Sequence, residues 1–349
     1  MAEELLTQIR IFARMTPQGK VDVVEGFMGQ QLITAMVGDG GNDCGALRSA
    51  HVGLGIGSAS SASTASVVAP FTTAAESVMP ICELLREGRG ALATSFASYR
   101  FMIVSGLMSG AWKITQVQFG VMSSLPMCYL SELIGFLAFG WAMSFARPAR
   151  TMQQNRPTSS LFSPTTMASV VGMAFIHASV FRLGIALIQQ HPDYVRFPKH
   201  LIRITEWWKL TRNWEVSTMF FIYTLQLYWM PVVFSFGSVW RRSWWSNSIL
   251  FRIWLVSTVV MFFVLLGDAN WLTRFLGLAY EVDASHEPWL TLGSPCPAMP
   301  KDLRAKIAVL LITSFTLTAL WERHVVFGTV FDCARRACFS WSKHVHLKL

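Results

Sequence analysis

The sequence predicts an α-helical multi-pass membrane protein with six transmembrane helices, preceded by a small α/β domain. Of its 349 residues, 52% are hydrophobic and only 14% are charged, and the mean hydropathy is +0.41. Soluble domains are less apolar and carry more charge. After residue 95, six stretches approach the roughly 20 apolar residues that cross a bilayer as a helix. The residues before them are rich in Gly, Ala and Ser.

The N-terminal region alternates between helix and short-strand patterns, which is typical of an α/β arrangement. Its Ser- and Ala-rich run Gly57–Ser66 favours a flexible surface loop over a phosphate cradle. The expected elements are a helix from about Pro17, a buried strand at Leu32–Val37, a helix after Asn42, and short strands near Val52 and Val67.

The most informative motif is Val37–Leu47, Val-Gly-Asp-Gly-Gly-Asn-Asp-Cys-Gly-Ala-Leu. Gly38 and Gly40 allow a sharp turn at the carboxyl end of the strand, where open α/β sheets bind ligands. Asp39 and Asp43 supply oxygen atoms, which a hard cation requires and which allow it to bridge to a phosphoryl group. A plain turn is the alternative for Gly-Asp-Gly alone.

This motif resembles the magnesium-binding hinge of P-type ATPases. Upstream, Phe12–Lys20 is Phe-Ala-Arg-Met-Thr-Pro-Gln-Gly-Lys. It resembles a family segment whose lysine neutralises the aspartyl phosphate in the haloacid-dehalogenase superfamily; Gly19 stands where relatives usually have Gln. The resemblance implies that role for Lys20, and a mobile point charge suits a phosphoryl group that changes position. The alternative is a solvated lysine at the start of an amphipathic helix.

Asn42–Leu54 and Ala65–Thr72 are more similar to the fifth subfamily of P-type ATPases, group B, the endosomal and lysosomal polyamine transporters. Leu84–Phe96 resembles the stalk that leads into the family's fifth membrane helix. The resemblance implies a partial haloacid-dehalogenase-like (Rossmann-like) phosphorylation domain with stalk at 1–95, a six-helix transmembrane domain at 96–327 and a basic cytosolic tail at 328–349.

The same resemblance implies chemical roles for the hinge. Asp39 and Asp43 would ligate Mg²⁺, Asn42 would order the hinge together with Asp43, and Gly38 and Gly40 would allow close approach of the cofactor. In the complete enzyme the nucleotide is ATP. Lys20, Asp39, Asn42 and Asp43 are therefore the expected catalytic residues.

Other pump motifs are absent from the sequence. P-type pumps are phosphorylated on the Asp of Asp-Lys-Thr-Gly-Thr, and no Asp here is followed by Lys-Thr. The Thr-Gly-Glu actuator motif, the nucleotide-binding domain and the first four membrane helices are missing too. The resemblance therefore implies the C-terminal part of a pump that is catalytically incomplete alone and has the N-terminal part as a potential partner. A truncated gene model, a gene fragment and a degenerate copy all stay open, and no signal peptide is expected.

The six spans would match the family's fifth to tenth helices, which places both termini in the cytosol. The fifth is the clearest, and the first is the least clear because Lys113 interrupts it. The expected spans are Phe101–Val121, Leu125–Phe145, Met167–Ile188, Val216–Val239, Ile249–Gly267 and Ala305–Trp321.

Charge supports this orientation only in part. Basic residues after the second and fourth spans and in the tail favour the cytosol, whereas the bases between the third and fourth spans would be lumenal. The net charge of +9 indicates contact with anionic membrane lipid. No stretch interleaves aromatics and bases as a nucleic-acid site does, so no nucleic acid is expected. The Cys and His spacings predict no metal site. The pairs Trp207–Trp208 and Trp244–Trp245 indicate membrane interfaces.

Glu132 is the candidate substrate residue. An acidic side chain in an apolar span is costly and usually faces a cavity or a base. Ser131–Leu133 falls where the family has Ile-Asp-Leu, an acidic position that helps to bind the cationic substrate. A structural pair with Arg100 or Lys113, and a position at the lipid interface, are the alternatives.

Three functions follow from these patterns. The first is a pump part that couples ATP hydrolysis to movement of an organic cation or polyamine out of an endosomal, lysosomal or other endomembrane lumen. The second is a non-enzymatic multi-pass protein that keeps the pump scaffold and binds lipid or a partner. The third is a sister-branch pump that extracts misplaced helices from the endoplasmic reticulum.

Overall fold

The computed structural model describes residues 6–57, 64–152, 156–202, 210–236, 239–281, 297–330 and 332–333. The chain divides into two compact units, Met1–Gly88 and Arg89–Leu349. Most of the expected tail at 328–349, residues 58–63 of the expected loop Gly57–Ser66, and the pair Trp207–Trp208 lie outside the described residues. The domain boundaries therefore stay predictions. The described end of the loop Gly57–Ser66, residues 64–66, is helical, so the loop expectation was wrong there.

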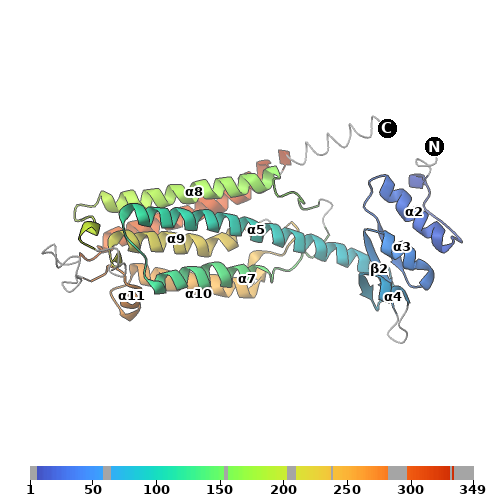
Figure 1. Cartoon of the computed structure of the whole chain (residues 1–349), viewed down its shortest axis with the longest axis horizontal. Helices are drawn as coiled ribbons and strands as arrows, with labels where there is room; N and C mark the ends of the chain where they lie inside the picture. Colours follow the sequence, from blue (N-terminus) through green and yellow to red (C-terminus); the bar gives the residue numbers. More distant parts are fainter. Residues whose placement is uncertain are drawn as a thin grey trace. The chain divides into compact units, whose positions relative to one another are not determined.

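The first unit contains a parallel three-stranded sheet in the order β1-β2-β3 (Figure 1). Parallel neighbours need a crossover connection, and short helices follow β1 and β2. The expected α/β arrangement is therefore present as a fold pattern. Its elements are α2 (Pro17–Gly29), β1 (Ala35–Gly38), η1 (Gly41–Asp43), α3 (Cys44–Ser49), β2 (Val52–Ile56), α4 (Thr64–Val68) and β3 (Phe71–Thr73).

Two expectations for this unit were wrong. The apolar run before β1 is not buried, because β1 pairs only with β2 among the described residues and Leu32 and Ile33 are 44% and 67% exposed. The segment around Val67 is helical, and the third strand begins only at Phe71. Buried Ala65 anchors this helical turn, and Pro70, which cannot continue a helix, separates it from the strand. Tertiary packing outweighed the β-propensity of the valines.

Six helices of the described residues are long and apolar enough to cross a membrane, which confirms the expected number. They lie in the second unit, except that the first turns of the helix that begins at Pro80 belong to the first. The fifth is the most apolar and the first the least, as expected. They are α5 (Pro80–Phe119); α6 (Leu125–Tyr129), η2 (Leu130–Ala138) and α7 (Phe139–Met143) as one span; α8 (Pro164–Gln189); α9 (Trp214–Val233); α10 (Ser248–Leu266); and α13 (Lys301–Leu320) continued by η6 (Trp321–Val330).

Two spans end elsewhere than expected. The helix α9 stops at Val233, six residues before the expected end, while the sixth span continues beyond Trp321 to Val330. Both η2 and η6 are π-helical, a rare form of helix. In the described part of the connections, short helices lie at η3 (Lys199–Leu201), η5 (Trp244–Ser246) and α11 (Trp271–Leu276).

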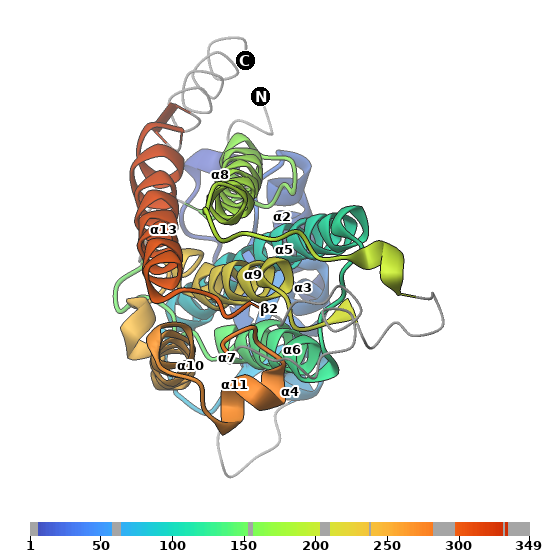
Figure 2. The ribbon, with the colours of Figure 1, turned by 90° about the vertical axis from the view of Figure 1, so that its left-hand side faces the viewer.

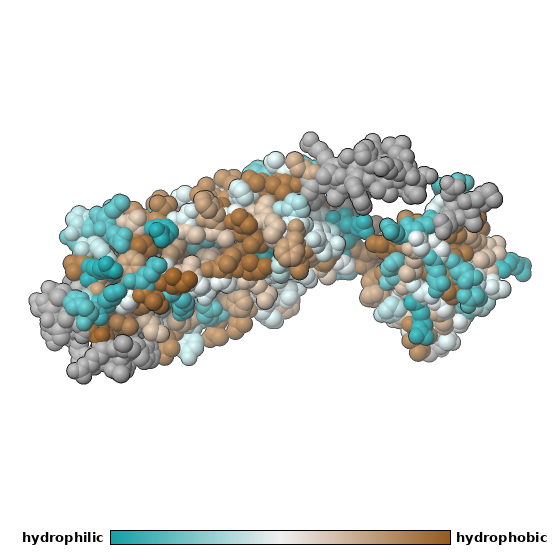
Figure 3. Space-filling model, turned by 45° about the horizontal axis from the view of Figure 1, so that its top comes forward, coloured by the Kyte–Doolittle hydropathy of each residue, from teal (hydrophilic) through white to brown (hydrophobic). Residues whose placement is uncertain are grey.

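The helix α9 forms the core of the bundle. All 20 of its residues are buried, and α7, α8, α10, α13 and η2 pack against it; Figure 2 shows it surrounded by the other spans. Large apolar side chains such as Val117, Phe175 and Phe263 are exposed instead, and Figure 3 shows hydrophobic surface along the bundle. An apolar exterior is what a bilayer requires.

Candidate functional site

The Gly-Asp-Gly loop folds around the carboxylate of Asp43. The loop follows β1 directly, and Asp43 is only 6% exposed. The backbone N–H of Gly40 donates to Oδ2 of Asp43 at 3.3 Å, and the N–H of Asp43 donates to the carbonyl of Gly40 at 3.0 Å. The turn at the end of β1 therefore holds one carboxylate in a fixed, shielded position.

Lys20 reaches this carboxylate from α2. Thr16 caps that helix by accepting from the N–H of Gly19 at 3.0 Å, and Pro17 occupies its first turn. This start places Lys20 so that its Nζ lies 2.6 Å from Oδ1 of Asp43, although 23 residues separate the two in sequence. The Lys20 side chain is 29% exposed, so its ammonium is half-shielded and still accessible. The fold thus joins two residues that the sequence had singled out separately.

Close contacts within the loop explain why positions 38 and 40 are occupied by glycine. A Cβ at Gly38 would lie 2.6 Å from the Cβ and 2.7 Å from the Cγ of Asp43. A Cβ at Gly40 would lie 2.6 Å from Oδ1 of Asn42. Any side chain at these positions would displace the polar groups of the loop, so the glycines are required for close packing.

Asp39 and Asn42 are exposed at the same loop. Carboxylate and amide oxygens are the donors that Mg²⁺ prefers, so the residue types fit that cation. Both oxygens of Asp43 already accept hydrogen bonds, which leaves Asp39 as the carboxylate open to solvent. Among the described residues, at this loop and elsewhere, no group of three or more His, Cys, Asp and Glu side chains is placed to hold a metal ion.

Glu132 lies in the π-helical η2 and is half-buried. Its Oε1 accepts a hydrogen bond from the hydroxyl of Tyr223 in α9 at 3.2 Å. The ring of Tyr223 stacks on Trp112 of α5, with centroids 4.3 Å apart and 20° between the planes. Beside Glu132, the hydroxyls of Ser131 and Thr224 are 2.7 Å apart and buried. A carboxylate and an aromatic pair therefore meet where three helices pack.

The expected bases do not pair with Glu132. Arg100 forms an ion pair with Glu322, so that alternative for Glu132 was wrong. The Nζ of Lys113 lies 4.2 Å from the ring centroid of Trp112 and 3.9 Å from Sγ of Cys128. Among the described residues, Glu132 is hydrogen-bonded by the tyrosine and not by a base.

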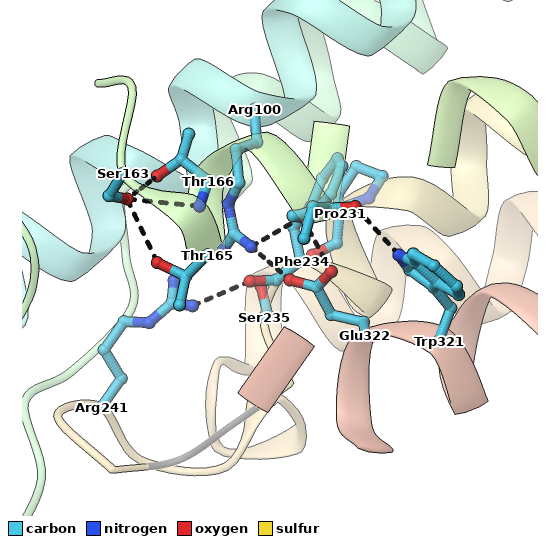
Figure 4. Close-up of polar contacts among 12 residues, drawn as sticks. Arg100, Ser163, Thr165, Thr166, Pro231, Phe234, Ser235, Arg241, Trp321 and Glu322 are labelled. Atoms are coloured by element: carbon cyan, nitrogen blue, oxygen red, sulfur yellow. Dashed lines mark hydrogen bonds and ion pairs between the residues drawn. The ribbon is translucent and has the colours of Figure 1, made fainter. Parts of the chain in front are cut away.

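Arg100 belongs to a buried polar cluster that the sequence did not predict (Figure 4). Nη1 of Arg100 pairs with Oε1 of Glu322 and donates to Oγ of Ser169 at 2.9 Å. Ser169 in turn donates to Oε2 of Glu322 at 2.8 Å, and Glu322 is 0% exposed. The sequence signal for this cluster was Glu322, a charged residue directly after the expected end of the sixth span. Because that span was expected to end at Trp321, Glu322 was placed outside it.

A second buried acid, Glu215, was also missed as a structural residue. The hydroxyl of Tyr194 donates to its Oε1 at 2.8 Å, and the N–H of Phe197 donates to the same atom at 3.2 Å. Burial raises the pKa of the Tyr194 hydroxyl, and the charge of Glu215 adds to this shift. Glu215 therefore anchors the connection before α9.

No protein-family model matches the chain. Among curated proteins it is 25% identical over 361 residues to probable cation-transporting ATPase 13A4 of Mus musculus, covering 97% of this chain and 28% of that protein. It is 29% identical over 290 residues to polyamine-transporting ATPase 13A3 of Homo sapiens, covering 77% of this chain and 23% of that protein.

A Gallus gallus protein, probable cation-transporting ATPase 13A4, is 28% identical over 298 residues, covering 76% of this chain and 24% of the relative. The chain thus spans about a quarter of the length of the curated relatives it matches. The apolar helices and these similarities agree on a membrane protein. Over most of its length the chain is homologous to the cation- and polyamine-transporting P-type ATPases of the 13A family, consistent with a fragment of a type 5B P-type ATPase.

Proposed function

We propose that this chain contributes part of the phosphoryl-binding site of a type 5B pump, and that it also contains the pump's cation pathway. The observation that carries the proposal is the Lys20–Asp43 pair at the carboxyl end of β1, in a chain that also has six candidate spans. ATP hydrolysis would drive movement of an organic cation through the bundle. Both termini would face the cytosol, and the protein would reside in an endosomal, lysosomal or other internal membrane.

The proposal treats the first unit as part of a haloacid-dehalogenase-like phosphorylation domain. Asp43 holds the ammonium of Lys20 at the loop, where that charge would offset the negative oxygens of a phosphoryl group. Asp39 and Asp43 would supply carboxylate ligands to Mg²⁺, with Asn42 ordering the turn. A bound Mg²⁺ would neutralise phosphoryl charge and orient its oxygens.

The second unit would supply the pathway for the cation. A half-buried carboxylate within an apolar span is a natural partner for a positively charged substrate. The stacked rings of Trp112 and Tyr223 lie next to Glu132, and aromatic faces also attract organic cations. One curated relative is named a polyamine transporter, so polyamines are the substrate class we propose first.

The chain by itself should be catalytically incomplete. None of its aspartates is followed by Lys-Thr, and a P-type cycle needs a phosphorylated aspartate. Lys20 and Asp39 would then act on a phosphoryl group carried by another part of the pump. The lack of an Asp followed by Lys-Thr also favours a second candidate function, a non-enzymatic membrane protein that keeps the pump scaffold and binds lipid or a partner.

A chimera tests the proposal. The chain would replace the matching segment of human polyamine-transporting ATPase 13A3, and labelled ATP with Mg²⁺ would report an acid-stable, hydroxylamine-sensitive phosphoenzyme. We expect the chimera to form it and the isolated chain not to. A folded chimera that forms none, beside an unaltered relative that does, would favour the non-enzymatic function.

A further inference from the structure

A small pocket lies at one end of the helix bundle, beside the Arg100–Glu322 pair. Its volume is about 70 Å³, well below the few hundred Å³ of a typical drug-sized ligand site. It lies where helices begin and end: at the first turn of α8, in the connection after α9 and in η6. The polar side chains in its wall are Arg100, Thr158, Thr165, Thr166 and Arg241.

Arg241 brings a buried charge to this wall. The residue is 4% exposed, and its Nη2 donates to the carbonyl of Phe234 at 2.9 Å. Its Nη1 is buried and has no hydrogen-bond partner in the described part of the chain. Burial, followed by the nearby charge of Arg100, lowers the pKa of Arg241 to about 10, so the guanidinium stays protonated at neutral pH. An unpaired charged donor in such a place is costly.

The wall carries a net positive charge. Arg100 and Arg241 bring two guanidinium groups, and Glu322 next to the pocket neutralises one of them. Figure 4 shows the two arginines reaching this region from α5 and from the connection after α9. One positive charge therefore remains without a counter-charge among the described residues that line the pocket.

The start of α8 adds hydrogen-bond donors and a positive dipole. This helix has 26 residues, and Ser163 caps it by accepting from the N–H of Thr166 at 3.3 Å. The hydroxyls of Thr165 and Thr166 lie 3.1 and 2.9 Å from that of Ser163. Helix N-termini favour anions, and hydroxyl groups can complete the shell of an oxyanion.

We propose that this pocket binds a phosphate group with one net negative charge, as found in a phosphodiester. The free donor of Arg241 would bond its oxygens, because guanidinium groups match phosphate geometry. Since the pocket lies where the spans end, an anionic phospholipid headgroup can reach it from the bilayer; a soluble phosphate can reach it from water. The inference is independent of the transport function.

Thermal unfolding of the purified full chain in neutral detergent tests the site. The probes are dioctanoyl phosphatidylglycerol, dioctanoyl phosphatidylcholine and inorganic phosphate. Phosphatidylcholine controls for the acyl chains, because its choline cation cancels the phosphate charge. The variants are Arg241→Gln, Arg241→Lys and, as a matched control, Arg252→Gln. Arg252 lies in α10, is exposed and donates to the backbone carbonyl of Ser248.

We expect phosphatidylglycerol to raise the melting temperature of the unaltered chain and of Arg252→Gln in a saturable manner. Arg241→Gln should need at least tenfold more lipid, and Arg241→Lys should lie between. The same pattern with inorganic phosphate alone would identify a soluble anion as the occupant. If Arg241→Gln fails to fold, Thr165→Val, which removes one hydroxyl from the wall, must weaken the response. The proposal would be overturned if neither phosphatidylglycerol nor inorganic phosphate raised the melting temperature. It would also be overturned if the rise were equal in the pocket variants and in Arg252→Gln.

Discussion

Arg100 of α5 and Glu322 of η6 form a buried ion pair although 222 residues separate them in the sequence. Ser169 of α8 bonds both partners, so the cluster joins three spans at one point. Removing two charges from water is costly, and only the pair together with its hydrogen bonds offsets that cost. The cluster is therefore more sensitive to the loss of one partner than to the loss of both.

Glu322→Gln should lower the free energy of unfolding by about 3–5 kcal/mol, because it leaves the guanidinium of Arg100 buried without a counter-charge. Thermal and denaturant unfolding of the purified chain in detergent would measure this. Glu281→Gln is the matched control, since Glu281 pairs with Arg274 at the surface with both side chains exposed. Such pairs contribute at most about 1 kcal/mol. The double variant Arg100→Met/Glu322→Leu should regain most of the loss; equal melting of Glu322→Gln and Glu281→Gln would show that the pair is not critical.

Gly38→Ala should disrupt the loop around Asp43. The added Cβ would meet the carboxylate within 3 Å, and relief of that clash costs about 1–3 kcal/mol. Hydrogen exchange of peptides covering β1 and α3 in the full chain should become faster. Gly41→Ala in the same loop is the control, because its Cβ would meet Thr64 only at 3.9 Å. Similar exchange in the two variants would contradict the packing role of Gly38.

Asp39→Ala should abolish Mg²⁺-dependent turnover of the chimera while leaving its melting temperature unchanged, since Asp39 is exposed. Loss of a metal ligand removes several kcal/mol of charge stabilisation, and about 4 kcal/mol corresponds to about a thousandfold in rate. Asp22→Ala in α2 controls for a surface carboxylate; Asp22 is exposed and accepts a hydrogen bond from Gln18. Turnover within a factor of two of the unaltered chimera would identify Asp39 as a turn residue only.

Glu132→Gln should weaken substrate-stimulated ATPase activity of the chimera with little change in melting temperature, because the amide keeps the shape and removes the charge. Tyr223→Phe provides the comparison: it removes the hydroxyl that Glu132 accepts from and keeps the stacked ring. We expect it to change substrate affinity less than Glu132→Gln does. A clear fall in melting temperature with unchanged substrate affinity would make Glu132 a structural residue.

Local patterns predicted much of this fold. Each span depends on a continuous apolar run, which the sequence shows directly, so the six spans were found with most of their ends. The Lys20 and Asp43 motifs were recognised separately from their own neighbours, and the fold then brought them within 2.6 Å. Their chemical roles stay predictions, because contact alone does not establish catalysis.

The features that were missed depend on contacts between distant segments. Arg100 was considered only as an alternative partner for Glu132, in the next span, because the sequence does not show that η6 returns to α5. The π-helical turns of η2 and η6 have no residue pattern that distinguishes them in the sequence from the α-helices around them. The burial of the run before β1 was overestimated for a related reason: hydrophobicity indicates a strand, whereas neighbours decide whether it is covered.

The complete burial of α9 has a consequence for biosynthesis. Two of its neighbours, α10 and α13, are translated after it, so its buried polar residue Gln226 meets its final surroundings only when the last span arrives. Nε2 of Gln226 donates to Ser314 of α13 at 3.3 Å. Until then α9 lies in the membrane with this side unpacked. A ribosome that stops before Lys301 therefore leaves the centre of the bundle, rather than its edge, open to quality control.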